Sequence, residues 1–151
     1  MPNRNFASIV ILVADDDAED RMLVKDALEE SRLANHVNFV EDGEELMDYL
    51  RNQGKYADKN LYPSPGLILL DLNMPRKDGR EAVKEIKADP NLRIIPIVVL
   101  TTSKAEEDII KTYDLGVSSF ITKPVTFSSM VDIMKTLGKY WFEIVELPHK
   151  R

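Results

Sequence analysis

The sequence contains no cysteine, which excludes disulfide bonds and leaves the hydrophobic core to stabilise the fold alone. This absence fits a reducing compartment. Long apolar runs are also missing. The first run, residues 9–14, stops at Asp15 and is too short for a signal peptide or a membrane-spanning helix. We therefore expect a soluble, cytoplasmic protein with no membrane contact.

Basic residues are in the minority. The sequence has 20 Lys and Arg against 26 Asp and Glu, a formal net charge of -6, and no basic stripe with interleaved aromatic residues. Such a chain repels the phosphates of nucleic acids, so direct nucleic-acid binding is not expected. The 151 residues are 44% hydrophobic and 30% charged, a balance typical of globular domains. We predict one domain over residues 1–151, with a core over about residues 8–145.

Short apolar runs alternate with helical patterns along the chain. The runs predict strands at residues 9–14, 37–40, 67–70, 94–100 and 117–121. The helical patterns cover residues 18–32, 44–51, 79–88, 105–114 and 127–141. Residues 52–66, rich in Pro, Gly and polar residues, predict a long surface loop. Five strand–helix pairs indicate an α/β fold, a doubly wound parallel sheet with helices on both faces.

In such open sheets, functional sites lie beyond the carboxyl ends of the strands. Carboxylates, hydroxyls and one ammonium group follow the strand ends here, in Asp15, Asp16, Asp17, Asp71, Thr101, Thr102 and Lys123. Clustered carboxylates repel one another unless a cation joins them, and oxygen ligands suit Mg2+. A carboxylate can also accept a phosphoryl group, with Mg2+ and a lysine offsetting the transferred charge.

Each of these residues also has a purely structural interpretation. The three aspartates can cap a helix, and Asp71 can form a turn. Thr101 and Thr102 can cap the next helix, and Lys123 can be an exposed turn residue. Four such coincidences at one sheet edge are less probable than one shared site, which favours the functional interpretation.

The sequence resembles the receiver domain of two-component response regulators, whose fold is a five-stranded, flavodoxin-like (βα)5 sheet. The matching motifs, in order, are residues 11–17 (ILVADDD), 69–75 (LLDLNMP), 78–79 (DG), 99–103 (VLTTS) and 120–124 (FITKP). The resemblance implies a phosphoprotein that takes a phosphoryl group from a histidine kinase and signals through a change of conformation. It implies no classical enzyme activity, beyond catalysis of its own phosphotransfer and autodephosphorylation.

The resemblance also implies a role for each matching residue. Asp71 is the phosphoacceptor, and Lys123 pairs with it or with the phosphoryl group. Thr101 turns its hydroxyl toward the phosphoryl group, and Phe120 is the aromatic switch residue that moves with it. Asp15, Asp16, Asp71 and the backbone carbonyl of Asn73 hold Mg2+. The Lys123–Pro124 peptide bond is expected to be cis.

A narrower resemblance, to phytochrome-associated single-domain response regulators, rests on residues 67–72, 77–81, 98–103 and 140–143 and on the long loop. It implies a sensor histidine kinase linked to a bacterial phytochrome as partner. With no output domain expected, the signal goes to a downstream protein or a phosphotransfer protein, or acts through a homodimer. Residues 140–142 are either packed on the sheet or part of a dimer contact.

Two other functions use similar residues. A Mg2+-dependent phosphatase of the haloacid dehalogenase type also places an aspartate after a strand, but it needs a second aspartate two residues on, where this chain has Asn73. A receiver fold kept as an unphosphorylated docking scaffold is the other alternative. The intact set of Asp16, Asp71, Thr101 and Lys123 argues against it.

Overall fold

The computed structural model describes residues 10–31, 36–101, 106–123 and 126–138, and they form alternating strands and helices. The order is β1 (Ile11–Ala14), α1 (Ala18–Glu30), β2 (Val37–Val40), α2 (Gly43–Leu50), η2 (Gly54–Tyr56), β3 (Leu67–Leu70), α3 (Gly79–Ala88), β4 (Ile97–Thr101), α4 (Glu106–Leu115), β5 (Ser119–Thr122) and α5 (Phe127–Gly138). The strands pair in parallel in the order β2-β1-β3-β4-β5. The predicted doubly wound parallel sheet is confirmed.

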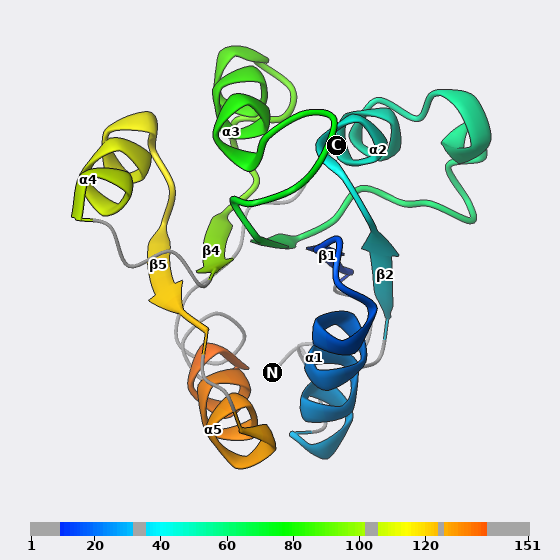
Figure 1. Ribbon diagram of the computed structural model, residues 1–151. Helices are drawn as coiled ribbons and strands as arrows, with labels where there is room; N and C mark the ends of the chain where they lie inside the picture. The colour runs from blue at the N-terminus through cyan, green and yellow to red at the C-terminus, as the bar shows by residue number, and fades with distance from the viewer. Residues whose placement is uncertain (1–9, 32–35, 102–105, 124–125, 139–151) are drawn as a thin grey trace, which may run out of the picture.

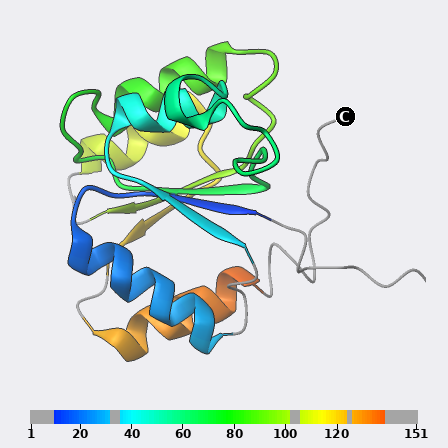
Figure 2. The same ribbon diagram turned by 90° about the vertical axis from the view of Figure 1, so that its right-hand side faces the viewer.

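The sheet lies between two layers of helices. Helices α1 and α5 pack side by side on one face, and α2, α3 and α4 cover the other (Figures 1 and 2). Strands β1, β3 and β4 are buried along their whole length because both faces are covered. Alternate residues therefore enter opposite cores: Leu12 and Leu70 face α2 and α3, whereas Val13 and Leu69 face α1 and α5.

Three helices begin at an aspartate that caps them. The carboxylates of Asp17, Asp42 and Asp78 accept hydrogen bonds from backbone N–H groups in the first turns of α1, α2 and α3. Each cap satisfies helix N–H groups that have no partner within the helix. Acidic residues in each first turn also suit the positive end of the helix dipole. These caps place the start of each helix directly beside the carboxyl edge of the sheet.

Besides β1, which begins at Ile11 and not at residue 9, two predicted strands begin too early. Strand β4 begins at Ile97, not at residue 94, because Pro96 has no N–H to donate; Ile94 lies in a turn and is exposed. Strand β5 begins at Ser119, not at residue 117, since Val117 bonds back to Thr112 at the end of α4. The fold class is unaffected because both strands keep their place in the sheet.

The segment between α2 and β3 differs from the predicted surface loop. Tyr56, in η2, is buried, and its ring packs against Tyr49 and Tyr62 with centroids 5.3 and 4.8 Å away. The Asn52 side chain donates to the backbone carbonyls of Tyr56 and Tyr62. Aromatic residues spaced along the segment thus form a small core of their own against α2. The prediction of a surface loop was wrong here because it rested on the many Pro and Gly residues of the segment.

Some predictions lie outside the described residues. They include the cis peptide bond, because Pro124 is outside, and the aromatic residues 140–142. Within the part of the chain that the structure describes, no helix is both long and apolar enough to cross a membrane.

Gly43, the first residue of α2, gives a first testable prediction. A Cβ at this position would lie 2.0 Å from the backbone oxygen of Lys77, in the loop between β3 and α3. Helix propensity alone would make Gly43→Ala stabilising. The clash is with backbone and cannot be relieved by a rotamer, so we expect a loss of about 3 kcal/mol in the free energy of unfolding.

Urea unfolding measures this loss. Glu44→Ala, at the next and exposed position of the same helix, is the control and should change stability by about 0.5 kcal/mol or less. A Gly43→Ala protein as stable as the wild type would show that α2 and the loop are not in the close contact described.

Candidate phosphoacceptor and metal site

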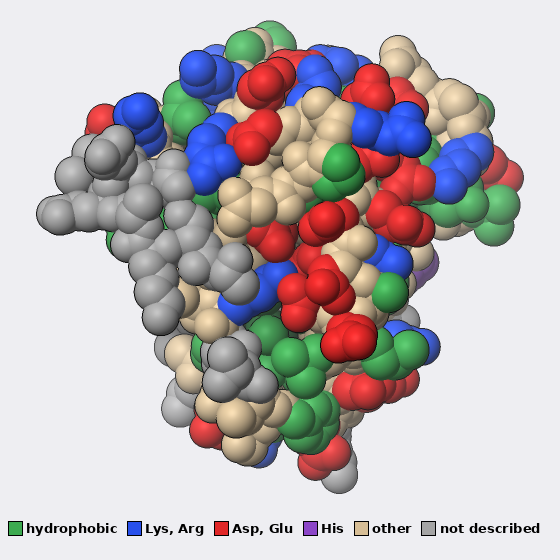
Figure 3. All heavy atoms as spheres, viewed as in Figure 1, with side chains coloured by type: hydrophobic (Ala, Val, Ile, Leu, Met, Phe, Trp, Pro, Cys, Tyr) green, Lys and Arg blue, Asp and Glu red, His purple; other side chains and the backbone are tan. Residues whose placement is uncertain are grey.

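The predicted site residues follow the carboxyl ends of four neighbouring strands. Asp15 follows β1, Asp71 follows β3, Thr101 ends β4 and Lys123 follows β5. Because the strands are parallel and adjacent, these ends share one edge of the sheet. Figure 3 shows acidic side chains gathered in the middle of the face viewed. The first turn of α1, Asp71 and Asn73 line an open hollow of about 640 Å³ here.

Lys123 is the cation at the centre of this cluster. Its Nζ donates to Asp15 Oδ2 at 2.5 Å, to Asp20 Oδ2 at 2.8 Å and to Asp71 Oδ2 at 3.0 Å. The side chains of Lys123 and Asp15 are both only 4% exposed, and that of Asp71 is 8% exposed. An ammonium group has three N–H donors, so all three are used. The lysine thus neutralises part of a buried concentration of negative charge.

Asp71 is held by three separate donors. Besides Lys123 on Oδ2, its Oδ1 accepts from Thr101 Oγ1 at 2.7 Å and from the backbone N–H of Asn73 at 3.0 Å. Thr101 is completely buried, and the Asn73 side-chain nitrogen lies 3.5 Å from its hydroxyl. The carboxylate is therefore fixed in orientation, with one side toward the open hollow lined also by Asp16.

The sequence left two roles open for the three aspartates after β1, helix capping and membership of a shared site, and the structure assigns different roles to different aspartates. Asp17 caps α1, its Oδ1 accepting from the N–H groups of Glu19 and Asp20. Asp15 is buried, accepts from the backbone N–H of Asp17 and contacts Lys123, while Asp16 is exposed in the hollow. Of these three aspartates, Asp17 is the one that caps the helix, and Thr102 lies outside the described residues. Thr101 belongs to β4 and bonds Asp71, so it is not a helix cap.

Burial and charge act against each other on the ionisable groups of the site. Burial raises the pKa of the Asp15 carboxyl above its usual value, and the hydrogen bond from Lys123 offsets only part of that rise. Burial would lower the pKa of Lys123, but its hydrogen bonds to Asp15 and Asp20 outweigh it and raise the pKa. Lys123 therefore stays protonated, and the Asp15 carboxyl loses its proton less readily than an exposed aspartate does.

The carboxylates fit a divalent cation. Oxygen atoms of Asp15, Asp16 and Asp71 lie within 4.8 Å of one another. Three carboxylate oxygens at such spacing, open to water on one side, are the ligands that hard divalent ions take in proteins. Burial disfavours the negative charge of Asp15, and a bound cation would favour it, which is a second reason. Asn73 also lines the hollow, and its backbone carbonyl stays a predicted further ligand.

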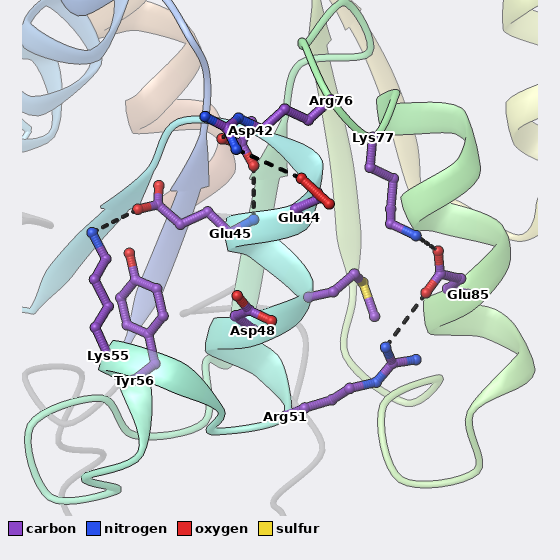
Figure 4. A pocket seen from close by; sticks show the side chains of 11 residues that line it. Asp42, Glu44, Glu45, Asp48, Arg51, Lys55, Tyr56, Arg76, Lys77 and Glu85 are labelled. Atoms are coloured by element: carbon purple, nitrogen blue, oxygen red, sulfur yellow. Dashed lines mark hydrogen bonds and ion pairs between the residues drawn. The ribbon is translucent and has the colours of Figure 1, made fainter.

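Helix α2 fixes the loop that follows Asp71. A Cβ on Gly79, where that loop enters α3, would lie 2.6 Å from the Asp71 carbonyl oxygen, so α3 also packs closely on the acceptor backbone. Arg76 adopts a left-handed conformation with φ 66°, and its guanidinium lies 3.4 Å from Asp42 Oδ2 and 3.8 Å from Glu44 Oε1 on α2. Figure 4 shows these ion pairs, together with that between Lys77 and Glu85. The loop between β3 and α3, residues 72–78, is therefore held both by α2 and by α3.

Phe120 is the predicted site residue that lies apart from this cluster. Its half-buried ring packs against the core beneath α2 and α3, and its backbone N–H donates to Tyr113 Oη on α4 at 3.0 Å. Phe120 pairs with Val99, whereas Thr101 pairs with Thr122 at the end of the same two strands. Its role as a switch residue stays a prediction.

Asp20 is a site residue that the sequence analysis missed. It contacts Lys123 from the first turn of α1, three residues after the helix cap. The strand-end rule considers only residues that directly follow strands, and so it passes over a helical position. Asp20 would have been found by asking which residues of the capped first turn face back toward the sheet edge.

A parallel five-stranded sheet that buries Asp71, Lys123 and Thr101 at its carboxyl edge defines a receiver domain. The chain belongs to the response regulator receiver domain family, whose model matches residues 11–135. It is 41% identical over 139 residues to the response regulator Rcp1 of Synechocystis sp., with 92% of each chain covered. Both the fold class and the predicted family are thereby confirmed.

Solved structures agree with this assignment. The Mn2+-bound form of Rcp1 is 40% identical, with a TM-score of 0.83. The alignment covers 93% of this chain and 99% of the Rcp1 chain. The phosphorylated cyanobacterial phytochrome response regulator RcpA is 44% identical, with a TM-score of 0.86 and the same coverage. The predicted relation to phytochrome response regulators is confirmed. The phosphatase alternative is not favoured, because the receiver domains of response regulators are phosphoacceptors and generally not classical enzymes.

Proposed function

We propose that this response regulator accepts a phosphoryl group on Asp71 from a sensor histidine kinase. The observation that carries the proposal is the position of the Asp71 carboxylate, which lines an acidic hollow and is held by Thr101, Asn73 and Lys123. A nucleophile fixed in this way loses little conformational freedom when it reacts, which lowers the barrier to transfer.

The step we propose moves phosphorus from nitrogen to oxygen. An oxygen of Asp71 attacks the phosphorus of a phosphohistidine, the O–P bond forms, and the N–P bond breaks. The electron pair of that bond stays on the imidazole nitrogen, so no other reactant is needed. Lys123 and the Thr101 hydroxyl are placed to donate hydrogen bonds to the phosphoryl oxygens, where negative charge is concentrated.

We further propose Mg2+ as the metal, held by Asp15, Asp16, Asp71 and the carbonyl of Asn73. When bound it supplies positive charge that offsets the charge of the transferring phosphoryl group. Mg2+ suits a site of few carboxylates with room for water. The Mn2+-bound form of Rcp1 supports the binding of a divalent ion, since Mg2+ and Mn2+ both favour oxygen ligands.

The signal would pass from Thr101 to Phe120. Thr101 Oγ1 already donates to Asp71, so a phosphoryl oxygen has only to take over this hydrogen bond from the carboxylate. A small shift of Thr101 at the end of β4 is transmitted to its neighbour β5, which carries Phe120 and its bond to Tyr113. The surface of α4 and β5 is thus the proposed output face, read by a downstream protein, by a phosphotransfer protein or in a homodimer.

The proposed kinase is that of a bacterial phytochrome, as the resemblance to RcpA supports. Its phosphohistidine has to reach the hollow, and two exposed apolar side chains lie near the starts of α1 and α5, the helices that follow β1 and β5. Met22, one turn into α1, is 55% exposed, and Phe127, at the start of α5, is 43% exposed. Apolar side chains exposed beside a reaction site are typical of a docking surface.

Met22→Ala should therefore slow phosphotransfer from a phosphorylated bacterial phytochrome kinase by about fivefold. It should leave labelling by acetyl phosphate, which needs no docking, unchanged. Leu61→Ala, at an exposed apolar residue of the long loop, is the control and should affect neither reaction. Equal slowing with both donors would place Met22 in the chemistry instead of the docking.

Incubation with acetyl phosphate tests the proposal as a whole. Intact-mass spectrometry is expected to detect one added phosphoryl group in Mg2+ and none in EDTA. Steady release of phosphate from a small phosphate ester would favour the phosphatase. No labelling under any metal condition would favour the docking scaffold.

A further inference from the structure

All three N–H donors of Lys123 are in use before any phosphoryl group arrives. They go to Asp15, Asp20 and Asp71, at 2.5, 2.8 and 3.0 Å. A phosphoryl group on Asp71 brings further oxygens, each needing a donor. The donor now on Asp71 can pass directly to the phosphoryl group, but a second hydrogen bond from Lys123 to a phosphoryl oxygen requires Asp15 or Asp20 to give one up. The question is which carboxylate can leave most easily.

Burial singles out Asp20. The Asp15 side chain is 4% exposed, whereas that of Asp20 is 33% exposed. A buried carboxylate that loses its cation is left unpaired, which costs free energy. A partly exposed carboxylate loses less, because water solvates it in place of the cation. Asp20 also lies in the first turn of α1, where the positive end of the helix dipole stabilises a negative charge. The released Asp20 carboxylate is therefore still stabilised.

We propose that Asp20 is a positioning residue that holds one donor of Lys123 while Asp71 is free and yields it to the incoming phosphoryl group. This inference rests on the proposed function of Asp71 and Lys123. Asp20 acts through Lys123 and competes with the phosphoryl group for the same N–H. It therefore weakens the phosphorylated state and sets how readily the receiver is activated.

Beryllium fluoride, a phosphoryl mimic that binds an aspartate in the presence of Mg2+, tests the competition directly. Asp20→Asn removes the charge from the competing carboxylate and should tighten binding of the mimic by about fivefold, measured by titration calorimetry. Asp20→Glu keeps a carboxylate and should restore affinity to within about twofold of the wild type.

Glu19→Gln is the matched control, because Glu19 is an exposed carboxylate in the same helical turn. It removes the same charge, and its effect on mimic binding should be less than about twofold. Mg2+ affinity without the mimic should fall slightly and equally in Asp20→Asn and Glu19→Gln. General loss of charge or misfolding cannot produce tighter mimic binding in one variant only.

The possible results distinguish a failure of the role of Asp20 from a failure of the proposed function of Asp71. If Asp20→Asn and Glu19→Gln bind the mimic equally, Asp20 does not compete for Lys123. If Asp20→Asn binds the mimic and Mg2+ more weakly, Asp20 supports the metal instead. If the wild type binds no mimic in Mg2+, or Asp71→Asn binds it as well as the wild type, the proposed function fails as well.

Discussion

Asp71→Asn is expected to reduce phosphorylation by acetyl phosphate by about a thousandfold or more, the largest effect of any single change. Asparagine keeps the size and the hydrogen-bond acceptor of aspartate but lacks the negatively charged oxygen that attacks phosphorus. Thr101 and the backbone N–H of Asn73 can still hold the amide in place. The loss would therefore reflect the missing nucleophile and not a displaced site.

Intact-mass spectrometry over time gives the rates. Asp26→Asn, at an exposed aspartate of α1, is the control and should be labelled like the wild type. The Asp71→Asn protein should also remain folded, since the substitution reduces repulsion among the site carboxylates. Undiminished labelling of this variant would mean that another residue carries the phosphoryl group.

Lys123→Met is expected to have the largest effect on stability within the site, a loss of about 3 kcal/mol in the free energy of unfolding at neutral pH without metal. Methionine keeps most of the apolar stem, so the change removes mainly the charge. The buried carboxylates of Asp15 and Asp71 would then lose their shared counter-charge. Adding Mg2+ should restore more stability to this variant than to the wild type.

Urea unfolding with and without Mg2+ measures both effects. Lys55→Met is the matched control, because Lys55 pairs with Glu45 at 2.8 Å but is 69% exposed, and this variant should unfold almost like the wild type. Similar losses in the two variants would show that burial does not decide the strength of these ion pairs.

The pH dependence of the Lys123→Met deficit follows from Asp15. Burial already raises the pKa of this carboxyl, and loss of Lys123 removes the hydrogen bond that lowers it. A carboxyl whose pKa is raised by folding favours the folded state at acidic pH, and this contribution is lost as pH rises through the folded pKa. The stability deficit of the variant should therefore shrink as pH falls below neutral. A stability deficit that does not change with pH would contradict a raised pKa of the buried Asp15 carboxyl.

The sequence predicts the fold well because a buried parallel strand leaves a continuous apolar run. Residues 67–70, for example, form β3 with the predicted bounds. The starts of β4 and β5 were harder to place. Ile94 and Val117 are as apolar as strand residues. Strand β4 begins only after Pro96, which has no N–H to donate, and Val117 bonds back to Thr112 before β5 begins.

The site was predictable to the extent that it follows the strand ends. Asp15, Asp71, Thr101 and Lys123 come from four strands, and parallel pairing brings them together. Asp20 was not predicted, because its contact depends on the direction of a helical side chain. The tyrosine cluster of the long loop was missed for a similar reason: its members are distant from one another in a segment with no periodic pattern.

Chemical mapping of the phosphorylated residue tests the central claim most directly. The protein is phosphorylated with acetyl phosphate and Mg2+, the acyl phosphate is reduced with borohydride, and the modified residue is located by peptide mass spectrometry. The account predicts reduction of Asp71 to homoserine, with Asp15, Asp16 and Asp20 unchanged. Modification of any other residue, or none at Asp71 in a protein that has gained a phosphoryl group, would contradict it.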